Sequence, residues 1–214
     1  MIENHILNET LRYLGAEDGV FDDAFVQLVT RAIDRVEKAA KKQHCIRRIA
    51  CFVNGNDVCL GTHSTTSLQL ANHLQGCDEV FLFAATLGTE VDRLLHRDAV
   101  SQPSLAVAEQ AAAAALIEQY CDDVCEQLAS SLDGLFCRPR FSAGYGDFLL
   151  SEQPYILQAL DTGRRIGLTC TQAFMLAPTK SVTAVIGISK QPSRCYAKGC
   201  DCCSKTDCLF RRKT

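Results

Sequence analysis

An uninterrupted apolar run at residues 80–85 (VFLFAA) constrains the fold of this chain more than any other feature. Six apolar residues in succession leave no polar face for water, which is typical of a β-strand covered on both faces. Soon after the run, Gly88 permits a tight turn, and Thr89 is placed to cap a helix that extends to about Arg97. The sequence therefore predicts a buried strand followed closely by a helix.

The remaining pattern mixes helices with strands of the hairpin type. Apolar residues at helical spacing predict further helices at 8–15, 20–41, 64–74, 104–132 and 152–161. Alternation and turn signals predict strands at 45–53, 58–61, 165–171 and 181–189. This order favours an α+β fold, with a mixed, largely antiparallel sheet and flanking helices, over a regular βαβ wind.

Composition indicates a globular protein of one domain with, at most, a small appendage. The 214 residues are 47% apolar and 22% charged, and the net charge of −3 gives no general reason to expect binding to nucleic acid. Neither a secretory signal nor a run of about 18 apolar residues occurs, so a cytoplasmic protein without membrane association is expected.

Cysteine usage changes abruptly near the C-terminus. Five of the 13 cysteines lie between residues 195 and 208, beyond a boundary near residues 191–193. We therefore expect two units, an α+β domain at 1–192 and a cysteine-rich metal or iron–sulfur tail at 193–214. From Cys195 onward the chain is basic, because five Lys or Arg residues accompany two Asp residues.

The spacing Cys-x4-Cys-x-Cys-Cys-x4-Cys is typical of a metal site, since four thiolates complete a shell around Zn²⁺ or an iron–sulfur cluster. Two intervening residues let the sulfurs of Cys200 and Cys203 face one ion. The predicted ligands are Cys195, Cys200, Cys203 and Cys208. A set with Cys202 in place of Cys195 is an alternative, as is a reduced tail without a ligand. The pattern does not distinguish zinc from iron–sulfur.

A second concentration of unusual residues is the loop at 137–147 (CRPRFSAGYGD). Arg140 offers a bidentate fork suited to a carboxylate. Gly144 lacks the Cβ that would block a backbone–ligand contact, and Tyr145 supplies a flat ring with a polar tip. Taken alone, these residues are more often turn chemistry and a surface ion pair than a binding site.

The same region resembles the activation domain of cobalamin-dependent methionine synthase. The resemblance rests on RFSAGYGD at 140–147, IGLT at 166–169 and MLAPTKSV at 175–182. The segment AATLGTEVDR at 84–93 and the cysteine tail resemble a small, free-standing branch of that family. This chain is much shorter than the domain inside full-length methionine synthase, and that domain has no such tail.

What the resemblance implies is a site for S-adenosylmethionine. Carried over to this sequence, it places Arg140 at the methionyl carboxylate, with Ala143, Gly144 and Tyr145 along the ligand. It also suggests Glu118, on the alanine-rich helix, as the group that receives the ligand's ammonium. A surface Glu paired with a neighbour is the alternative reading of Glu118.

The implied function is to support reductive methylation, which reactivates the corrinoid of a separate cobalamin-dependent methionine synthase or another corrinoid protein. Cobalamin would belong to the partner, with flavodoxin or ferredoxin as a candidate electron donor. The chain would be an activation component of a methyltransferase system rather than a self-contained enzyme, acting by positioning. The alternative is a metal-binding interaction or electron-transfer module that docks on a corrinoid protein without binding S-adenosylmethionine.

Overall fold

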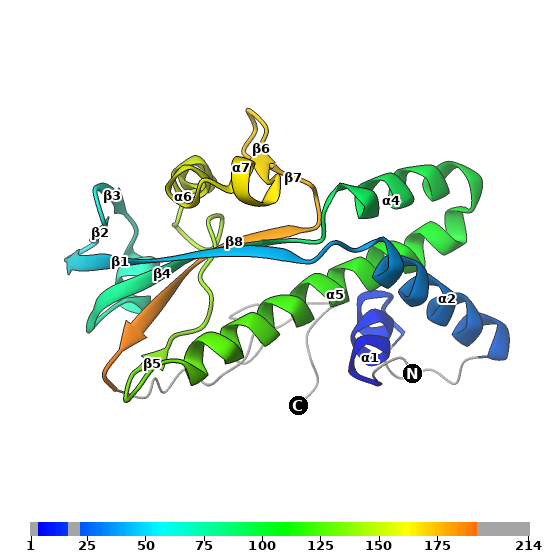
Figure 1. The fold of residues 1–214 in the computed structure, drawn as a ribbon, viewed down its shortest axis with the longest axis horizontal. Coiled ribbons are helices and arrows are strands. Elements are labelled where there is room, and N and C mark those ends of the chain that lie inside the picture. Colours follow the sequence, from blue (N-terminus) through cyan, green and yellow to red (C-terminus); the bar gives the residue numbers. More distant parts are fainter. Residues whose placement is uncertain (1–3, 17–21, 192–214) are drawn as a thin grey trace.

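A computed structural model describes residues 4–16 and 22–191 of the chain (Figure 1). Its main sheet has six strands in the order β3-β2-β1-β4-β8-β5, and every pair in that sheet is antiparallel. These strands are β1 (Gln43–Asn54), β2 (Asp57–Leu60), β3 (His63–Thr66), β4 (Cys77–Thr86), β5 (Phe136–Cys137) and β8 (Ser181–Ser189). A second sheet pairs β6 (Thr169–Cys170) with β7 (Leu176–Ala177). The predicted α+β fold with a largely antiparallel sheet is confirmed.

Helices cover both faces of the main sheet (Figure 1). They are α1 (Asn4–Tyr13), α2 (Asp23–Ala39), α3 (Leu68–His73), α4 (Thr89–Ser101), α5 (Pro103–Ser130), α6 (Gln153–Leu160) and α7 (Thr162–Ile166), with a short 3-10 turn η1 (Leu150–Glu152). The long helix α5 runs under one face, and α6 and α7 lie over the other. Within the described ranges, no helix is long and apolar enough to cross a membrane.

Strand β4 is the buried strand that the apolar run predicts. It lies between β1 and β8, and every residue from Val80 to Thr86 is buried. Side chains alternate along a strand, so odd-numbered residues of this run join the core on the α5 face and even-numbered residues join the core on the other face. Both cores therefore depend on this one strand.

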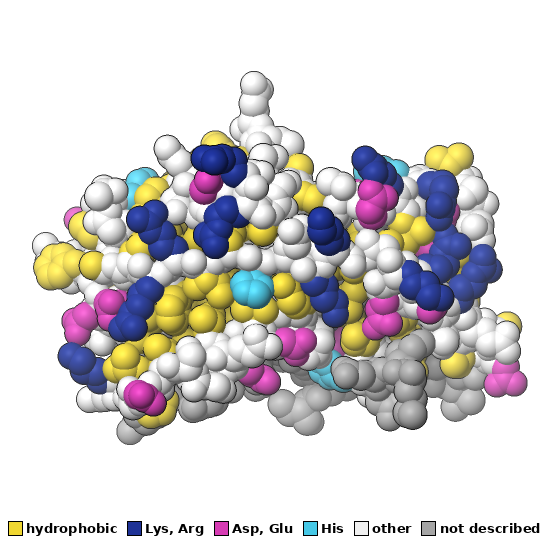
Figure 2. All heavy atoms as spheres, in the orientation of Figure 1, with side chains coloured by type: hydrophobic (Ala, Val, Ile, Leu, Met, Phe, Trp, Pro, Cys, Tyr) yellow, Lys and Arg dark blue, Asp and Glu magenta, His cyan; other side chains and the backbone are white. Residues whose placement is uncertain are grey.

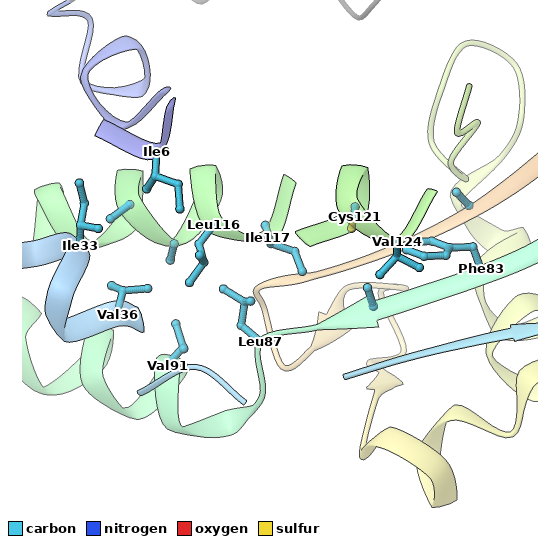
Figure 3. Close-up of a cluster of buried hydrophobic side chains, with 14 of the residues drawn as sticks. Ile6, Ile33, Val36, Phe83, Leu87, Val91, Leu116, Ile117, Cys121 and Val124 are labelled. Carbon is cyan, nitrogen blue, oxygen red and sulfur yellow. The ribbon is translucent and has the colours of Figure 1, made fainter. Parts of the chain in front are cut away.

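The core on the α5 face is filled from four helices as well as from the sheet. Figure 3 shows Ile33 of α2, Val91 of α4 and Leu116 of α5 converging with Leu87, which follows β4. The opposite core is built mainly from α3, α6 and the inner side of β2, together with the loop that precedes η1.

Two of the predicted elements are wrong. Residues 64–74 were expected as one helix, but β3 pairs with β2 and only Leu68–His73 is helical. The β-branched pair Thr65-Thr66 favours the strand, and Ser67 then caps the helix with its hydroxyl, which accepts from the Leu70 N–H. Residues 165–171 were expected as a strand, but α7 ends at Ile166 and only Thr169–Cys170 is paired.

The prediction that Thr89 caps helix α4 is also wrong. Gly88, with a φ of +83°, takes the N-cap position of α4, and no side chain caps this helix. The turn is held instead by Thr86, whose Oγ1 accepts from the Gly88 N–H at 3.0 Å. The remaining expected helices and strands are confirmed with small shifts at their ends.

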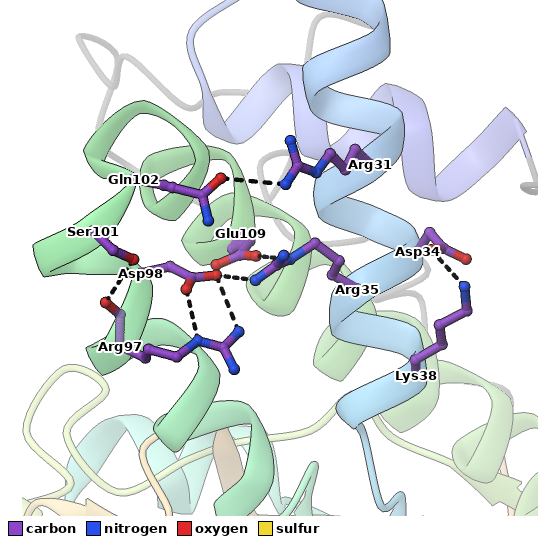
Figure 4. A network of polar contacts seen from close by, with 9 residues as sticks. All are labelled: Arg31, Asp34, Arg35, Lys38, Arg97, Asp98, Ser101, Gln102 and Glu109. Atoms are coloured by element: carbon purple, nitrogen blue, oxygen red, sulfur yellow. Dashed lines mark hydrogen bonds and ion pairs between the residues drawn. The ribbon is translucent and has the colours of Figure 1, made fainter.

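A buried ion network fastens α2 to α4 and α5 (Figure 4). Arg35 donates to Glu109 Oε1 at 2.7 Å and also to Asp98, which Arg97 contacts at 2.8 Å. Both carboxylates are almost completely buried, at 1% and 0% side-chain exposure. Glu109 Oε2 has no hydrogen-bond partner among the described residues. Burial, and then the negative charge of Asp98, raise the pKa of Glu109 against the opposing effect of Arg35.

Replacing Arg35 by Ala should lower the free energy of unfolding by about 3 kcal/mol or more, because it leaves buried carboxylates without a counter-charge. The loss should be smaller at pH 5 than at pH 8. A carboxyl with a raised folded-state pKa gains stability from its proton at low pH and loses that contribution as the pH rises through the folded pKa. Urea denaturation at the two pH values measures both effects. Lys38→Ala, which removes an exposed pair with Asp34, is the matched control and should cost about 0.5 kcal/mol or less.

Candidate functional site

A charged cluster joins the loop after β5 to helix α5. Arg140 Nη2 donates to Glu118 Oε2 at 2.8 Å, and Nη1 donates to Asp122 Oδ1 at 2.8 Å. The two carboxylates are four residues apart and therefore lie on one face of the helix. The Arg140 side chain is 17% exposed, whereas Glu118 and Asp122 are 45% and 40% exposed. One guanidinium between two carboxylates leaves a formal charge of −1, and that charge is accessible to water.

The cluster has an apolar floor next to Arg140. The thiol of Cys125 lies 3.7 Å from Arg140 Nη1, and Cys121 is fully buried one turn earlier. Burial raises the pKa of Cys125, with Arg140 acting in the opposite direction. Burial likewise raises the pKa of Cys121 well above its ordinary value. Both side chains are thus neutral thiols at physiological pH, and the charge of the cluster is set by its two carboxylates and its guanidinium.

The loop crosses the edge of the sheet immediately after Arg140. Phe141 exchanges two backbone hydrogen bonds with Val185 of β8, at 2.9 and 2.8 Å, so the chain is extended at this point. In extended chain, successive side chains point to opposite faces. Arg140 accordingly reaches α5, whereas Phe141 packs against the core on the opposite face, which Ala143 joins as a buried member.

Residues 143–145 make their contacts within the loop and on that opposite face. The Gly144 N–H donates to Phe148 O at 2.7 Å, and the Tyr145 N–H donates to Ser142 O at 3.1 Å. Gly144 has a φ of +94°, a value that only glycine adopts readily. The Tyr145 ring is 59% exposed and meets Phe141 edge to face, with ring centroids 6.0 Å apart. The structure thus brings Arg140 and Glu118 together, but it does not bring Ala143, Gly144 or Tyr145 to them.

Asp147 anchors the far end of the loop to α3. Its carboxylate accepts from the Ser67 hydroxyl at 2.5 Å and from the N–H groups of Leu68 and Gln69 at 2.7 and 3.1 Å. These hydrogen bonds, that of Ser67 first, lower the pKa of Asp147. Because the loop is fixed at both ends, at Val185 and at α3, the position of Arg140 is fixed as well.

A hollow of about 350 Å³ lies along α5 on the N-terminal side of the cluster. Its lining residues are Tyr13, Leu14, Val107, Gln110, Ala111, Ala114 and Lys180. Ala111 and Ala114 precede Glu118 by seven and four residues, which places them on its helix face at about 10 and 6 Å along the axis. Burial, and then the negative charge of Glu118, raise the pKa of Tyr13, so that ring lies within electrostatic reach of the cluster. The hollow is an open depression of the surface rather than an enclosed cavity, so a ligand bound in it would stay partly exposed to water.

Lys180 also lines the hollow. Its ammonium donates to Gln110 O at 3.2 Å, and burial lowers its pKa while Asp92 opposes that shift. Asp92 is itself held by Thr179, whose N–H and hydroxyl donate to the carboxylate at 2.8 and 2.6 Å. Lys180 is therefore the cation of the lining, whereas Glu118 lies one helical turn beyond Ala114 and is not among the lining residues.

Sequence reasoning missed Asp122, Tyr13 and Lys180. Asp122 had a usable signal, because it follows Glu118 by four residues on a predicted helix. Lys180 lies within the segment 175–182 on which the resemblance rests, but that segment does not indicate that Lys180 reaches α5. Tyr13 had no signal, since only the tertiary fold brings α1 to α5. The predicted metal ligands Cys195, Cys200, Cys203 and Cys208 lie outside the described residues. Among residues 4–16 and 22–191, no three His, Cys, Asp or Glu side chains form a group able to hold a metal ion.

Comparison with solved structures finds a similar fold in a crystal structure of the MetH reactivation domain bound to AdoHcy. The TM-score is 0.66 with 15% sequence identity, and the match covers 88% of this chain and 76% of that chain. No family model and no curated protein matches the chain. The similarity in structure therefore establishes a fold like that of the MetH reactivation domain.

Removing the anchor at the end of the loop should loosen it from α3. In Asp147→Ala, the amides of Leu68 and Gln69 lose their shared acceptor, and their hydrogen exchange should become about tenfold faster. Exchange measured by NMR or mass spectrometry tests this expectation. Asp78→Ala is the control, because that exposed carboxylate pairs with Lys190 away from α3. Equal exchange at Leu68 in both variants would mean that Asp147 does not hold the helix.

Proposed function

We propose that this chain binds S-adenosylmethionine and thereby supports reductive methylation of the corrinoid of a separate methionine synthase or related corrinoid protein. The observation that carries the proposal is the Arg140–Glu118–Asp122 cluster beside the hollow on α5. The fold shared with a domain whose structure contains AdoHcy supports it.

The cluster matches the amino-acid end of the ligand in charge. S-adenosylmethionine carries an ammonium and a sulfonium against one carboxylate, so it is a net cation, and the cluster is a net anion. In this proposal the ligand carboxylate takes one arm of the Arg140 guanidinium. The carboxylate released by Arg140 then receives the ligand ammonium, so the number of ion pairs does not fall on binding.

The hollow would take the rest of the ligand. The small side chains of Ala111 and Ala114 leave room for a ligand against the helix. The side chains of Leu14, Val107 and Tyr13 offer apolar contact for a nucleoside. Ala143, Gly144 and Tyr145 contribute by positioning, since the hydrogen bonds of their loop hold the backbone from which Arg140 extends. This differs from direct ligand contact, which the sequence resemblance implies for them.

The chemistry assigned to this chain is orientation. The partner corrinoid would supply the cobalt that accepts an electron and the methyl group, and S-adenosylhomocysteine would leave the site on this chain. The residues on α5 would hold the sulfonium at a fixed place and angle, which lowers the entropic cost of methyl transfer. No proton needs to move, so no acid–base pair is required, and the chain acts as an activation component.

The cysteine tail at 193–214 is proposed as a separate metal-binding unit after the domain at 1–192. Cys195, Cys200, Cys203 and Cys208 would bind an iron–sulfur cluster or zinc. A cluster would let the tail pass an electron from a flavodoxin or ferredoxin. Zinc would make it a structural or docking element. A module that docks on a corrinoid protein without binding S-adenosylmethionine is the second candidate function, because the predicted metal ligands include none of the residues of the α5 site.

Isothermal titration calorimetry with S-adenosylmethionine tests the ligand site. Arg140→Ala should weaken binding about tenfold to a hundredfold, the usual effect of losing a charge-assisted hydrogen bond. Arg140→Lys keeps the charge but lacks the planar fork of donors, so its affinity should lie between those of the wild type and Arg140→Ala. Glu118→Gln should also weaken binding. Arg164→Ala and Glu126→Gln are the matched controls, since both side chains are exposed and Glu126 lies on the same helix.

Folding of each variant is checked by thermal unfolding. Wild-type affinity in folded Arg140→Ala and Glu118→Gln would rule out the cluster as the binding site. No binding to the wild-type chain would favour the docking module. The variants that fail to bind should also fail to restore activity to an inactivated cobalamin-dependent methionine synthase in vitro.

Anaerobic purification, metal analysis and a visible spectrum test the tail. The double variant Cys200→Ser/Cys203→Ser should lose its bound iron or zinc, because it removes the local chelate. Cys170→Ser, a partly buried thiol of β6, is the control and should keep the metal. Undiminished metal in the double variant would exclude this ligand set.

A further inference from the structure

One half of β1 is an unpaired edge of the main sheet. Residues 43–50 pair with β4 on one side, but β2 pairs only with residues 51–54 on the other. Within the part of the chain that the structure describes, no other strand lies beside β1. Figure 1 shows this strand running along the sheet edge, between α5 under one face and α6 and α7 over the other.

The backbone groups that face this edge can be assigned. Ala50 O accepts from the Gly61 N–H at 2.9 Å, so the peptide groups of Ala50 point away from β4. In an antiparallel ladder, the backbone N–H and C=O groups of every second residue point to the same side of the strand. The N–H and C=O groups of His44, Ile46 and Arg48 therefore project from the free edge, in the positions that an added strand would use.

The edge is strongly basic. Residues 41–49 (KKQHCIRRI) contain four Lys or Arg residues and no Asp or Glu. Lys41, Lys42 and Arg47 are exposed, and Arg165 of α7 lies on the same side, close enough to lower the pKa of His44 after the larger effect of burial. Two carboxylates offset part of this charge, because Glu79 of β4 pairs with Arg48 and Asp161 lies near Cys45. Figure 2 shows Lys and Arg side chains along both flanks of this strand.

We propose that the free edge of β1 binds an extended, acidic segment of a partner protein by strand addition. Backbone hydrogen bonds to His44, Ile46 and Arg48 would supply the register, and the surrounding cations would select acidic side chains. A second copy of this chain fits less well, since antiparallel pairing of two such edges would set cations against cations. The proposal does not rest on the ligand site of α5.

The probe is a fluorescein-labelled peptide of alternating Val and Glu, eight residues long, titrated into the full chain and followed by fluorescence anisotropy. A peptide of alternating Val and Lys is the charge control. The acidic peptide should bind and the basic one should not. Hydrogen exchange should slow at the amides of His44, Ile46 and Arg48 when the acidic peptide is present.

Two substitutions at one position separate the backbone contact from charge. Both Arg48→Gln and Arg48→Pro remove the cation, but only proline also removes the backbone N–H that faces the free edge. An edge strand tolerates proline where the N–H faces solvent. Arg48→Pro should bind the acidic peptide about fivefold to tenfold more weakly than Arg48→Gln. Arg47→Gln should also weaken binding, whereas Arg93→Gln, on α4, should not.

Thermal unfolding confirms that each variant is folded, and the affinity of each for S-adenosylmethionine should equal that of the wild type. Equal binding of the acidic and basic peptides would overturn the proposal, and so would protection confined to other amides. If the acidic peptide does not bind and Arg47→Gln self-associates, the proposal is overturned. The cations would then serve only to keep two copies of the edge from pairing with each other. If Arg48→Pro does not fold, the comparison of the two peptides and the hydrogen exchange of the edge amides test the proposal.

Discussion

The fold depends on one strand that is buried from both sides. From Val80 to Thr86, β4 has no polar face, so the molecule must supply a helical layer above and below it. The α5 layer forms one of these covers and also carries Glu118 and Asp122. The opposite layer receives the loop that follows Arg140. The charged cluster therefore lies where the chain passes from one layer to the other, and the burial of β4 determines that crossing.

Local patterns in the sequence were enough to predict most of this architecture. The apolar run of β4, the helical period of α2 and the alanine-rich α5 are properties of consecutive residues, and each appears where it was expected. Residues 64–74 were mispredicted because β3 exists through its pairing with β2. Residues 165–171 were mispredicted because Gly167, at a φ of +65°, ends a short helix within an alternating pattern. The first error comes from a pairing between two elements, whereas the second comes from a local helix end that competes with the alternating pattern.

The site was less predictable than the fold. Arg140 and Glu118 are 22 residues apart and pair directly with each other, because a loop returns the chain to the helix it has just left. That contact corresponds to the alternative reading of Glu118, a Glu paired with a neighbour. The resemblance implies that Ala143, Gly144 and Tyr145 lie along the same ligand as Arg140. The bridge between Phe141 and Val185 makes the chain extended, and alternation then separates Arg140 from Ala143. That bridge depends on β8, which lies some 40 residues further along the chain.

The two ion clusters of this chain differ in a way that bears on function. Around Arg35, two buried carboxylates face two arginines, so the formal charge is balanced and water is excluded from the carboxylates. Around Arg140, one arginine faces two carboxylates that are 45% and 40% exposed. A contact that serves only to join two elements gains nothing from a second, exposed carboxylate, because that group adds repulsion without burial. An excess negative charge beside a hollow is, by contrast, what the recognition of a small cation requires.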